Sequence, residues 1–331
     1  MRGVGIAGYG GPEALRLSDW PVPEPGPGEV RVKVALAGVN FMDVYMRSGQ
    51  YAKSQTYPTP LPMLIGMEAA GTVDALGPGV SEPGVGTRVA YCLSRGSYAE
   101  YAVVPAWRLV PVPEGVGWSM AAALQLQGST AHYLSHSLFP LQPGQTCLVH
   151  AGAGGVGQLL VQLAKARGAR VIATVGSEEK AAIAAACGAD HTILYRAVDF
   201  QPEVRRLTDG RGVDVVYDSI GKDTVHRSIR SLRRRGTCVM FGASSGQVEG
   251  GIAPLELAEA GSVFFTRPHL ADYMQPEEVR ARGADLFAMA AAGRLKVAID
   301  SSLPLADAAE AHRYIEARKT RGKLLLDVGA A

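Results

Sequence analysis

The feature that most constrains the fold of this chain is a glycine-rich turn at residues 152–157, Gly-Ala-Gly-Gly-Val-Gly. The apolar run at residues 147–150 predicts a short buried strand before it, and residues 156–167 predict a helix after it. In such a strand-turn-helix unit the glycines permit a tight turn and close backbone approach, while the helix N-terminus offers unpaired N–H donors to a pyrophosphate. We therefore expect a dinucleotide to bind at Gly152, Gly154, Gly155, Val156 and Gly157.

The chain around this turn alternates between strand and helix patterns. Strands are predicted at residues 147–150, 170–175, 191–194, 213–218, 237–241 and 262–266, and helices at 156–167, 178–186, 200–207, 223–232 and 254–259. Apolar strands that alternate with helices are typical of a doubly wound parallel sheet of the Rossmann type. The expected fold class is α/β, with a dinucleotide-binding domain at residues 124–267.

The remaining segments predict a second, mostly β domain. Residues 1–123 contain short strands separated by proline-rich and glycine-rich turns. Residues 268–331 predict two helices and two strands, which cannot extend the parallel sheet without further crossovers. We therefore expect residues 268–331 to return to residues 1–123, so that the nucleotide domain is an insertion.

Charge and cysteine content argue against several classes of partner. The 33 basic and 31 acidic residues give a net charge of +2, which argues against a nucleic-acid partner, and no uncharged stretch reaches the length of a membrane span. The basic run Arg233-Arg234-Arg235 is interpreted as a solvated helix end. The four cysteines are far apart, which implies no disulfide framework, and a cytoplasmic protein is expected.

The end of the second predicted strand indicates which dinucleotide binds. Folds that prefer NAD place a carboxylate there for the ribose 2′-hydroxyl, whereas this strand is followed by Gly176 and Ser177. Gly176 leaves room, Ser177 can donate a hydrogen bond, and Lys180 can face a 2′-phosphate. Glu178 and Glu179 are the opposing evidence, but carboxylates also suit the first turn of a helix. The sequence therefore favours NADPH.

Several motifs together resemble those of a known family. They are the segment Asn40-Phe41-Met42-Asp43-Val44-Tyr45, the segment Arg47-Ser48-Gly49-Gln50-Tyr51, the glycine turn after His150, and the runs at residues 174–177, 217–221, 241–246 and 266–268. The chain resembles the zeta-crystallin-type quinone oxidoreductases, a zinc-free branch of the medium-chain dehydrogenase/reductase superfamily. The resemblance covers essentially the whole chain and implies that the β-rich domain is a GroES-like catalytic domain.

The resemblance also implies cofactor contacts. It assigns the nicotinamide pocket to Phe41, Met42, Asp43, Val44 and Tyr45 with Asn40 and Tyr51 beside them, and to Gln127, Thr130 and Tyr133. It assigns the adenosine phosphate to Gly176, Ser177, Lys180 and Tyr195, and closure over the cofactor to Phe241, Gly242, Ala243, Ser244, Phe265, Thr266, Arg267 and Arg318. Without the resemblance, a tyrosine at a strand end such as Tyr195 would as often have a packing role as a binding role, and Arg318 would be interpreted as a solvated charge.

No metal is expected. Zinc alcohol dehydrogenases share this architecture and carry a cysteine near the position of Asn40 and a histidine at the position of Met67, and neither ligand is present here. A structural zinc needs four closely spaced cysteines, but the corresponding stretch holds only Cys92. Glu68 is left as a buried carboxylate that needs a partner, and His150 either helps to bind the phosphates or ends a buried strand.

Without a metal, the acceptor must need little electrophilic help, and a conjugated quinone meets that requirement. Asn40, Tyr45 and Tyr51 are candidate donors to a developing oxyanion, although the tyrosines could equally form the wall of an apolar pocket, and Asp43 is expected to cap a helix. The closest rival is an enone or enoyl reductase, and a rival of another class is a non-catalytic NADPH-binding or RNA-binding protein. The last two strands of the parallel sheet would leave an edge for a homodimer.

Overall fold

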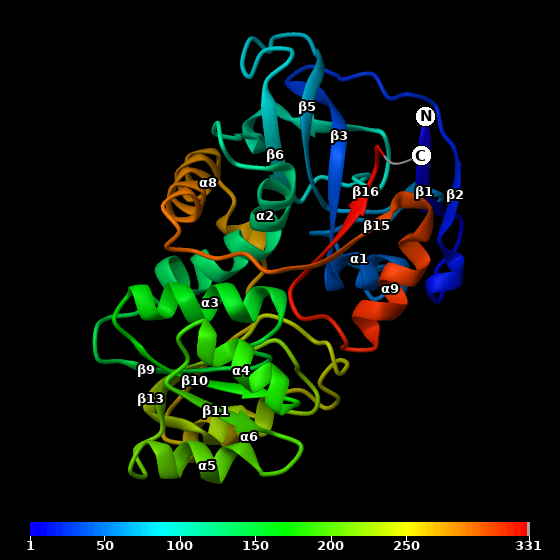
Figure 1. Ribbon diagram of the computed structural model, residues 1–331. Coiled ribbons are helices and arrows are strands. Elements are labelled where there is room, and N and C mark those ends of the chain that lie inside the picture. Colours follow the sequence, from blue (N-terminus) through cyan, green and yellow to red (C-terminus); the bar gives the residue numbers. More distant parts are fainter. Residues whose placement is uncertain (330–331) are drawn as a thin grey trace. The chain divides into compact units, whose positions relative to one another are not determined.

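The computed structural model describes residues 1–329, which form two compact units (Figure 1). The first unit contains Met1–Ser129 together with the chain from Met274 onward, and the second is Thr130–Tyr273. The unit boundaries lie a few residues beyond positions 123 and 267. The shift at the first boundary arises because helix α2 (Trp118–His132) contributes most of its length to the first unit.

The second unit contains a six-stranded sheet in which every neighbouring pair is parallel, in the order β11-β10-β9-β12-β13-β14. The strands are β9 (Thr146–Val149), β10 (Arg170–Val175), β11 (His191–Leu194), β12 (Val213–Asp218), β13 (Leu232–Met240) and β14 (Phe264–Thr266). This is the doubly wound order, with the change of direction between β9 and β12. The predicted α/β fold class is confirmed.

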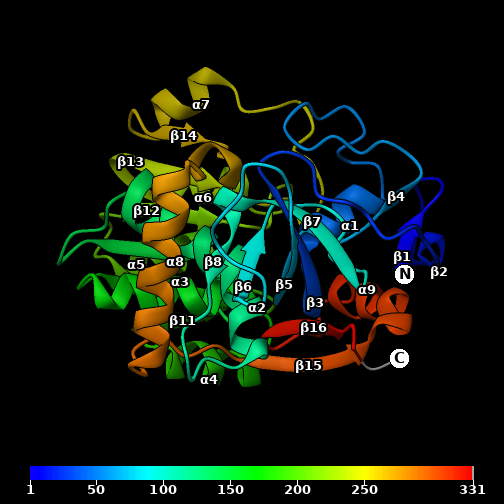
Figure 2. The same ribbon diagram turned by 90° about the horizontal axis from the view of Figure 1, so that it is seen from above.

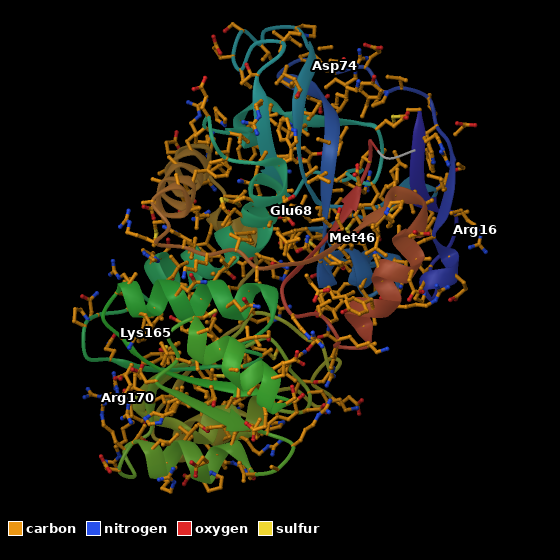
Figure 3. The ribbon with its side chains drawn as sticks, in the orientation of Figure 1. Arg16, Met46, Glu68, Asp74, Lys165 and Arg170 are labelled. Atoms are coloured by element: carbon orange, nitrogen blue, oxygen red, sulfur yellow. The ribbon has the colours of Figure 1, made fainter. Side chains whose placement is uncertain are left out.

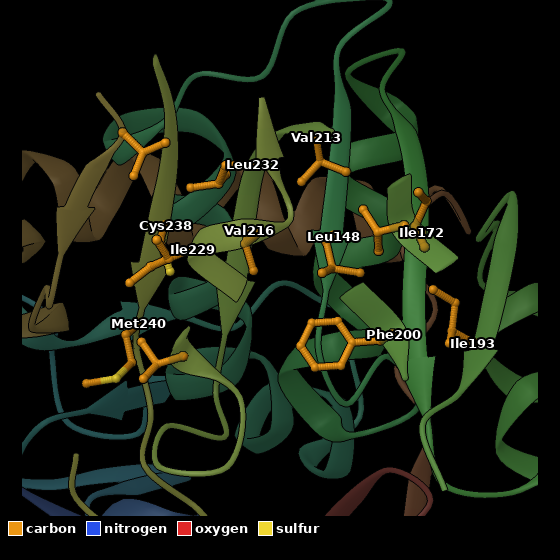
Figure 4. Packing of buried hydrophobic residues seen from close by; sticks show 13 residues of the cluster. Leu148, Ile172, Ile193, Phe200, Val213, Val216, Ile229, Leu232, Cys238 and Met240 are labelled. Carbon is orange, nitrogen blue, oxygen red and sulfur yellow. The ribbon is translucent and has the colours of Figure 1, made fainter. Parts of the chain in front are cut away.

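Helices connect these strands and bury their apolar side chains. They are α3 (Gly155–Ala166), α4 (Glu178–Ala186), α5 (Phe200–Leu207), α6 (Val225–Arg230) and α7 (Pro254–Glu259), preceded by a π-helical turn η3 (Tyr133–Leu138) and followed by the 3-10 turn η4 (Leu270–Tyr273). Figure 4 shows Phe200 of α5 packed near Leu148 and Val216 of the two central strands. Burial of such a side chain contributes about 1.5–3 kcal/mol, so this cluster fixes the strands that carry the nucleotide loops.

The first unit is built on a larger sheet in the order β15-β16-β3-β5-β6-β8, with β7 also paired to β3. The strands are β3 (Glu29–Val39), β5 (Glu68–Leu76), β6 (Arg88–Cys92), β7 (Tyr101–Pro105), β8 (Val110–Pro111), β15 (Ile299–Pro304) and β16 (Lys323–Asp327). β16 pairs antiparallel with the end of β3, so the C-terminal segment completes the sheet of the N-terminal segment.

Shorter elements surround this sheet. A small sheet contains β1 (Arg2–Ile6), β2 (Arg16–Asp19) and β4 (Met63–Leu64), and the helices are α1 (Phe41–Arg47), α8 (Pro276–Ala291) and α9 (Ala308–Glu316), with 3-10 turns η1 (Pro12–Ala14), η2 (Ala106–Arg108) and η5 (Leu305–Asp307). Apolar periodicity did not identify β1 or α1, which are too short to show a period, and α1 was anticipated only through the expectation that Asp43 caps a helix. In Figure 2, α1 and α9 lie near each other, and residues of the two helices are in contact.

The interpretation of the arginine run as a helix end is wrong. Helix α6 ends at Arg230, and Arg233, Arg234 and Arg235 lie inside β13. The strand register against β12 shifts in this region, Arg235 adopts a left-handed φ of 56°, and Arg233 forms an ion pair with Asp214 at 2.5 Å. A bulge therefore turns the run outward, so two of its three arginines are exposed without being part of a helix. None of the helices in residues 1–329 is long and apolar enough to span a membrane.

Candidate functional site

The glycine turn follows β9 and leads into α3 with Gly154 as the N-cap. The left-handed residue of the turn is Ala151, with a φ of 51°, rather than Gly152. Position 152 requires a glycine because a larger residue would not fit: a Cβ there would lie 2.7 Å from the Ala173 Cβ. A Cβ on Gly157 would likewise overlap the carbonyl oxygen of Ala151. The backbone thus approaches β10 closely and leaves the N-terminal N–H groups of α3 for an anion such as a pyrophosphate.

The residues predicted to hold the adenosine phosphate come together at the carboxyl end of β10. Ser177 is the N-cap of α4, and its Oγ accepts a hydrogen bond from Lys180 N at 3.3 Å, so the hydroxyl proton remains able to donate. A Cβ on Gly176 would lie 2.9 Å from the phenol oxygen of Tyr195, which places that half-exposed ring beside the glycine. Glycine, hydroxyl, lysine and phenol at one strand end suit a phosphate on the ribose.

Glu178 and Glu179 occupy the first turn of α4, where the sequence analysis expected them, and both are exposed. Carboxylates at this position interact favourably with the helix dipole. The strand itself ends without an acid at its tip, as expected for a site that takes a 2′-phosphate.

Asp218, at the end of β12, organises the adjoining loop and was not predicted. Its Oδ1 accepts from the backbone N–H groups of Ile220 at 2.8 Å and Gly221 at 3.0 Å, and both oxygens accept from the Thr224 hydroxyl at 2.8–2.9 Å. Oδ2 also accepts from the Ser228 hydroxyl at 2.7 Å. An acid directly after the apolar run of this buried strand was the signal that could have identified it.

His150 is buried between β10 and α6. Its Nδ1 lies 2.8 Å from the Thr174 hydroxyl and its Nε2 lies 3.0 Å from the Ser228 hydroxyl. Burial lowers the pKa of the imidazole, which is therefore neutral at pH 7. Because both nitrogens already have protein partners, the structure favours the reading of His150 as a buried strand end over a role in binding phosphates.

The other predicted contacts of the second unit lie in loops and at helix ends. Tyr133 is buried and stacked on Tyr273 at 4.5 Å, and Thr130 is buried in the preceding turn of α2. A Cβ on Gly242 would lie 2.7 Å from the carbonyl oxygen of Ser219, so the loop carrying Phe241, Gly242, Ala243 and Ser244 runs against the loop after β12. Phe265, Thr266 and Arg267 are at the end of β14, all partly buried. Arg318 is exposed beyond α9 in the first unit.

In the first unit, Asn40 and Asp43 cap the start of α1. The Asp43 Oδ2 accepts from the Asn40 backbone N–H at 2.8 Å and from the Tyr98 hydroxyl at 3.1 Å, so the expectation that Asp43 caps a helix is confirmed. Asp43 is fully buried, its Oδ1 has no hydrogen-bond partner among the described residues, and burial raises the pKa of this carboxyl to about 7. It can hold a proton near neutral pH.

The Asn40 side chain is part of a buried polar cluster with Glu68 and Lys323. Its Nδ2 donates to Glu68 Oε2 at 2.8 Å and to the Gly38 carbonyl at 3.3 Å, while its Oδ1 accepts from Lys323 Nζ at 2.8 Å. Both amide protons of Asn40 thus have acceptors in the protein. In this arrangement the candidate hydrogen-bond donors to a developing oxyanion are the two tyrosines, Tyr45 and Tyr51. Lys323 was not predicted, although a lone lysine opening an apolar strand was a signal.

The two predicted tyrosines lie in a row of aromatic rings on the same unit. Tyr45 packs against Phe41 at 6.1 Å and edge-on against Tyr51 at 5.7 Å, and Tyr51 packs against Tyr57 at 5.2 Å. Met42 and Val44 of α1 are also buried. The structure therefore brings Tyr45 and Tyr51 together, and the row also has the apolar walls that the alternative reading requires.

The residues at the expected zinc position do not fit a zinc ion. Glu68 already pairs with the Lys323 ammonium at 2.5 Å, and its neighbours Asn40 and Met67 supply an amide and a thioether instead of thiolate or imidazole. Within residues 1–329, no group of three or more His, Cys, Asp or Glu side chains could hold a metal ion.

Comparison with known proteins agrees with this geometry. Residues 26–114 match the alcohol dehydrogenase GroES-like domain, and residues 155–275 match the zinc-binding dehydrogenase family. A quinone oxidoreductase of Pseudomonas aeruginosa is 42% identical over 98% of both chains, and a 2-haloacrylate reductase of Burkholderia is 41% identical over 96% of both. The structure of Escherichia coli quinone oxidoreductase complexed with NADPH is 38% identical, with a TM-score of 0.94 over 99% of this chain and 100% of that one. The chain belongs to the quinone oxidoreductases of the medium-chain dehydrogenase/reductase superfamily.

Proposed function

We propose that this protein is an NADPH-dependent, metal-independent quinone reductase. The observation that carries the proposal is the combination of a pyrophosphate turn at Gly152–Gly157 with a strand end that offers Gly176, Ser177, Lys180 and Tyr195 in place of a carboxylate. Full-length similarity to quinone oxidoreductases supports the acceptor class. Metal independence is supported by the donor set, because Glu68 is committed to Lys323.

Each part of the second unit has a defined task in this reaction. The α3 N-terminus neutralises the pyrophosphate through backbone N–H groups, and Ser177 and Lys180 bind the 2′-phosphate. Asp218 holds the loop after β12 rigid through five hydrogen bonds, which fixes the edge at which the cofactor lies. These contacts position the cofactor and leave its chemistry unchanged.

When bound, NADPH supplies a hydride from C4 of its nicotinamide. Addition of that hydride and one proton converts a quinone to a hydroquinone, so electrons and protons balance without a metal. The Tyr45 and Tyr51 phenols donate to the quinone oxygen as its negative charge develops, and solvent provides the proton. The row of rings from Phe41 to Tyr57 orients a flat acceptor.

A second candidate acceptor is an activated alkene. The Burkholderia relative is named a 2-haloacrylate reductase, and hydride can add to the conjugated double bond of an enone as it does to a quinone. Aromatic walls and phenol donors would serve both acceptors, which differ in shape and in the atom that takes the hydride.

Rates of NADPH oxidation with a panel of quinones and a panel of enones and haloacrylates test these proposals. We expect the highest kcat/KM with a quinone, and failure with every acceptor would favour a non-catalytic NADPH-binding protein. Lys180→Ala should raise the KM for NADPH by about tenfold while leaving that for NADH unchanged, since a hydrogen bond to a charged group contributes about 1.5–3 kcal/mol. Lys165→Ala is the control, because Lys165 pairs with Asp190 instead.

We further propose a cytoplasmic homodimer. None of the four cysteines forms a disulfide, which suits a reducing compartment. β14 is the last strand of its sheet, and Phe264 on it is 63% exposed, so a second copy could extend the sheet there. Phe264→Glu should convert a dimer to a monomer in sedimentation velocity, and a parent chain that sediments as a monomer would contradict the proposal.

A further inference from the structure

A deeply buried ion pair of the first unit joins Lys323 to Glu68. The side chains are 1% and 0% exposed, and they come from the first residues of β16 and β5, which are far apart in sequence. A buried lysine is costly unless its ammonium is paired and fully hydrogen-bonded. Here the ammonium donates to Glu68 Oε2 and to Asn40 Oδ1, so Lys323 has one polar partner besides Glu68.

Glu68 connects two segments that both lead into predicted nicotinamide contacts. Its Oε2 accepts from the side chain of Asn40, the residue before Phe41, and its Oε1 accepts from the backbone N–H of Leu126, the residue before Gln127. One carboxylate therefore ties the start of α1 to the middle of α2. A shift of this carboxylate would move both segments at once.

Lys323 decides how the Asn40 amide is oriented. An amide has one acceptor side and one donor side, and Lys323 can only donate while ionised Glu68 can only accept. The two partners thus admit one orientation of Asn40, with Oδ1 toward β16 and Nδ2 toward β5. The backbone N–H of Asn40 also donates to Asp43 Oδ2, so the position of Asn40 affects the start of α1 as well.

We propose that Lys323 is a positioning residue for hydride transfer. Its ammonium acts through Asn40 and Glu68 and sets the segments at Phe41 and Gln127 that receive the nicotinamide. The ammonium supplies the positive charge that Glu68 needs, which makes an external cation unnecessary there. This inference rests on the proposed NADPH-dependent function.

A second ion pair that also uses a residue of β5 provides a control. Arg31 of β3 pairs with Asp74 of β5 at 2.6 Å, with side chains 17% and 29% exposed. Figure 3 labels Glu68 and Asp74 at opposite ends of β5. The control pair shares only β5 with the Lys323–Glu68 pair, and the hydrogen bonds of Arg31 go to Asp74, Pro23 and Glu24, not to Asn40 or α2.

The experiment compares the parent with Glu68→Gln/Lys323→Met, Lys323→Arg and the control Arg31→Met/Asp74→Asn. The double variant removes both charges together, which avoids an unpaired buried ion, and Lys323→Arg keeps the charge but moves the donor. Measurements are kcat and KM with the best acceptor, the NADPH dissociation constant, nicotinamide fluorescence on binding, and the thermal unfolding midpoint.

We expect kcat to fall about 10- to 100-fold in Glu68→Gln/Lys323→Met, because misplacement by about 1 Å can cost 100-fold. The NADPH dissociation constant should change less than about threefold, since the phosphate contacts of the second unit are intact, whereas the bound nicotinamide emission should differ from the parent. Lys323→Arg should show a smaller loss in the same direction, and the control variant should match the parent in kcat and emission.

Two outcomes would overturn the inference. One is a folded double variant, or a folded Lys323→Arg if the double variant does not fold, with parental kcat and emission. The other is loss of activity that follows the fraction of unfolded protein in both variants, which would make the pair purely structural. If the parent reduces neither quinones nor enones, the proposed function fails, yet emission and affinity for NADPH still decide the role of Lys323.

Discussion

Each unit contains a buried histidine within a series of hydrogen bonds that ends at a buried aspartate. In both series a donor side chain is followed by the histidine, a hydroxyl and the aspartate, but the hydrogen-bond distances differ. In the second unit, Thr174 donates to His150 Nδ1 at 2.8 Å, Nε2 donates to Ser228 at 3.0 Å, and Ser228 donates to Asp218 at 2.7 Å. The direction follows because the Ser228 proton is committed to Asp218. We call this series the Asp218 chain.

In the first unit, the corresponding series runs from Arg47 to His312, Tyr98 and Asp43, and we call it the Asp43 chain. Arg47 cannot accept, so His312 Nδ1 accepts at 3.4 Å, His312 Nε2 donates to Tyr98 at 3.2 Å, and Tyr98 donates to Asp43 at 3.1 Å. Burial and the Arg47 charge lower the pKa of His312 to about 3, so it is neutral like His150.

The two chains differ most at the carboxylates where they end. Asp218 accepts hydrogen bonds on both oxygens, whereas Asp43 accepts on Oδ2, and its Oδ1 has no hydrogen-bond partner within residues 1–329. A fully satisfied buried acid stabilises one loop conformation, and a half-satisfied one stays responsive to pH and to neighbouring groups. The comparison teaches that equal burial does not imply equal function.

The largest expected effect is the loss of Asp218. Asp218→Ala leaves two backbone N–H groups and two hydroxyls of a buried loop without their acceptor, and we expect it to lower the free energy of unfolding by about 4–5 kcal/mol. Urea unfolding followed by far-UV circular dichroism measures this loss. All three tryptophans, Trp20, Trp107 and Trp118, lie in the first unit, so their fluorescence reports that unit separately.

Asp199→Ala is the control for this measurement. Asp199 is an exposed N-cap that accepts from Gln201 N at 3.1 Å, and loss of such a cap costs about 1 kcal/mol. A loss for Asp218→Ala no larger than that of the control would show that satisfaction of the buried acid contributes little.

The next effect is a change in how stability depends on pH. The pKa of Asp43 is raised from 3.8 to about 7 in the folded protein, so unfolding releases its proton between these values. Its contribution to stability is complete below about pH 4 and is lost as pH rises through about 7. Asp43→Asn mimics the protonated form, and its stability relative to the parent should rise by about 2–3 kcal/mol from pH 5 to pH 8.

The comparison of variant with parent separates this effect from that of His312. Because the pKa of His312 is lowered to about 3, its contribution has the opposite sign: it is complete above about pH 6.5 and is lost as pH falls toward 3. Both proteins retain His312, so its effect cancels. A relative stability that is flat with pH would mean that Asp43 is ionised throughout this range.

Sequence patterns identified the elements whose signal is local. The bounds predicted for β10, α4 and β12 agree with the structure. Their signals, the spacing of apolar residues and the serine that caps α4, lie within a few residues of each other in the sequence. The steric need for glycine at positions 152 and 176, where we predict the cofactor to bind, was recognised for the same reason, since close backbone approach at a strand end requires a glycine in the sequence. The nucleotide-binding half of the candidate site was therefore predictable.

The acceptor half was less predictable because its side chains are paired across long sequence separations. Asn40 forms hydrogen bonds with Glu68, which is 28 residues away in the sequence, and with Lys323, which is 283 residues away. No periodicity or motif indicates such pairs. The prediction of Asn40 as a hydrogen-bond donor to a developing oxyanion omitted these partners, and Lys323 was missed altogether. Propensity also failed for β1, whose place depends on pairing with β2 and β4.

The smallest expected effects come from matched removal of the hydroxyl in the middle of each chain. Ser228→Ala removes an acceptor from His150 and a donor from Asp218 in a series of short bonds, so we expect a loss of about 2 kcal/mol in the dichroism transition. Tyr98→Phe removes the longer bonds of the Asp43 chain and should cost about 1 kcal/mol in the fluorescence transition. It should also raise the pKa of Asp43 further, because the Tyr98 hydrogen bond favours the ionised carboxyl. The two variants could instead lose equal free energies of unfolding, with no change in the pH profile of Tyr98→Phe. That result would mean that neither the hydrogen-bond distances nor the unpaired Oδ1 of Asp43 distinguishes the two chains.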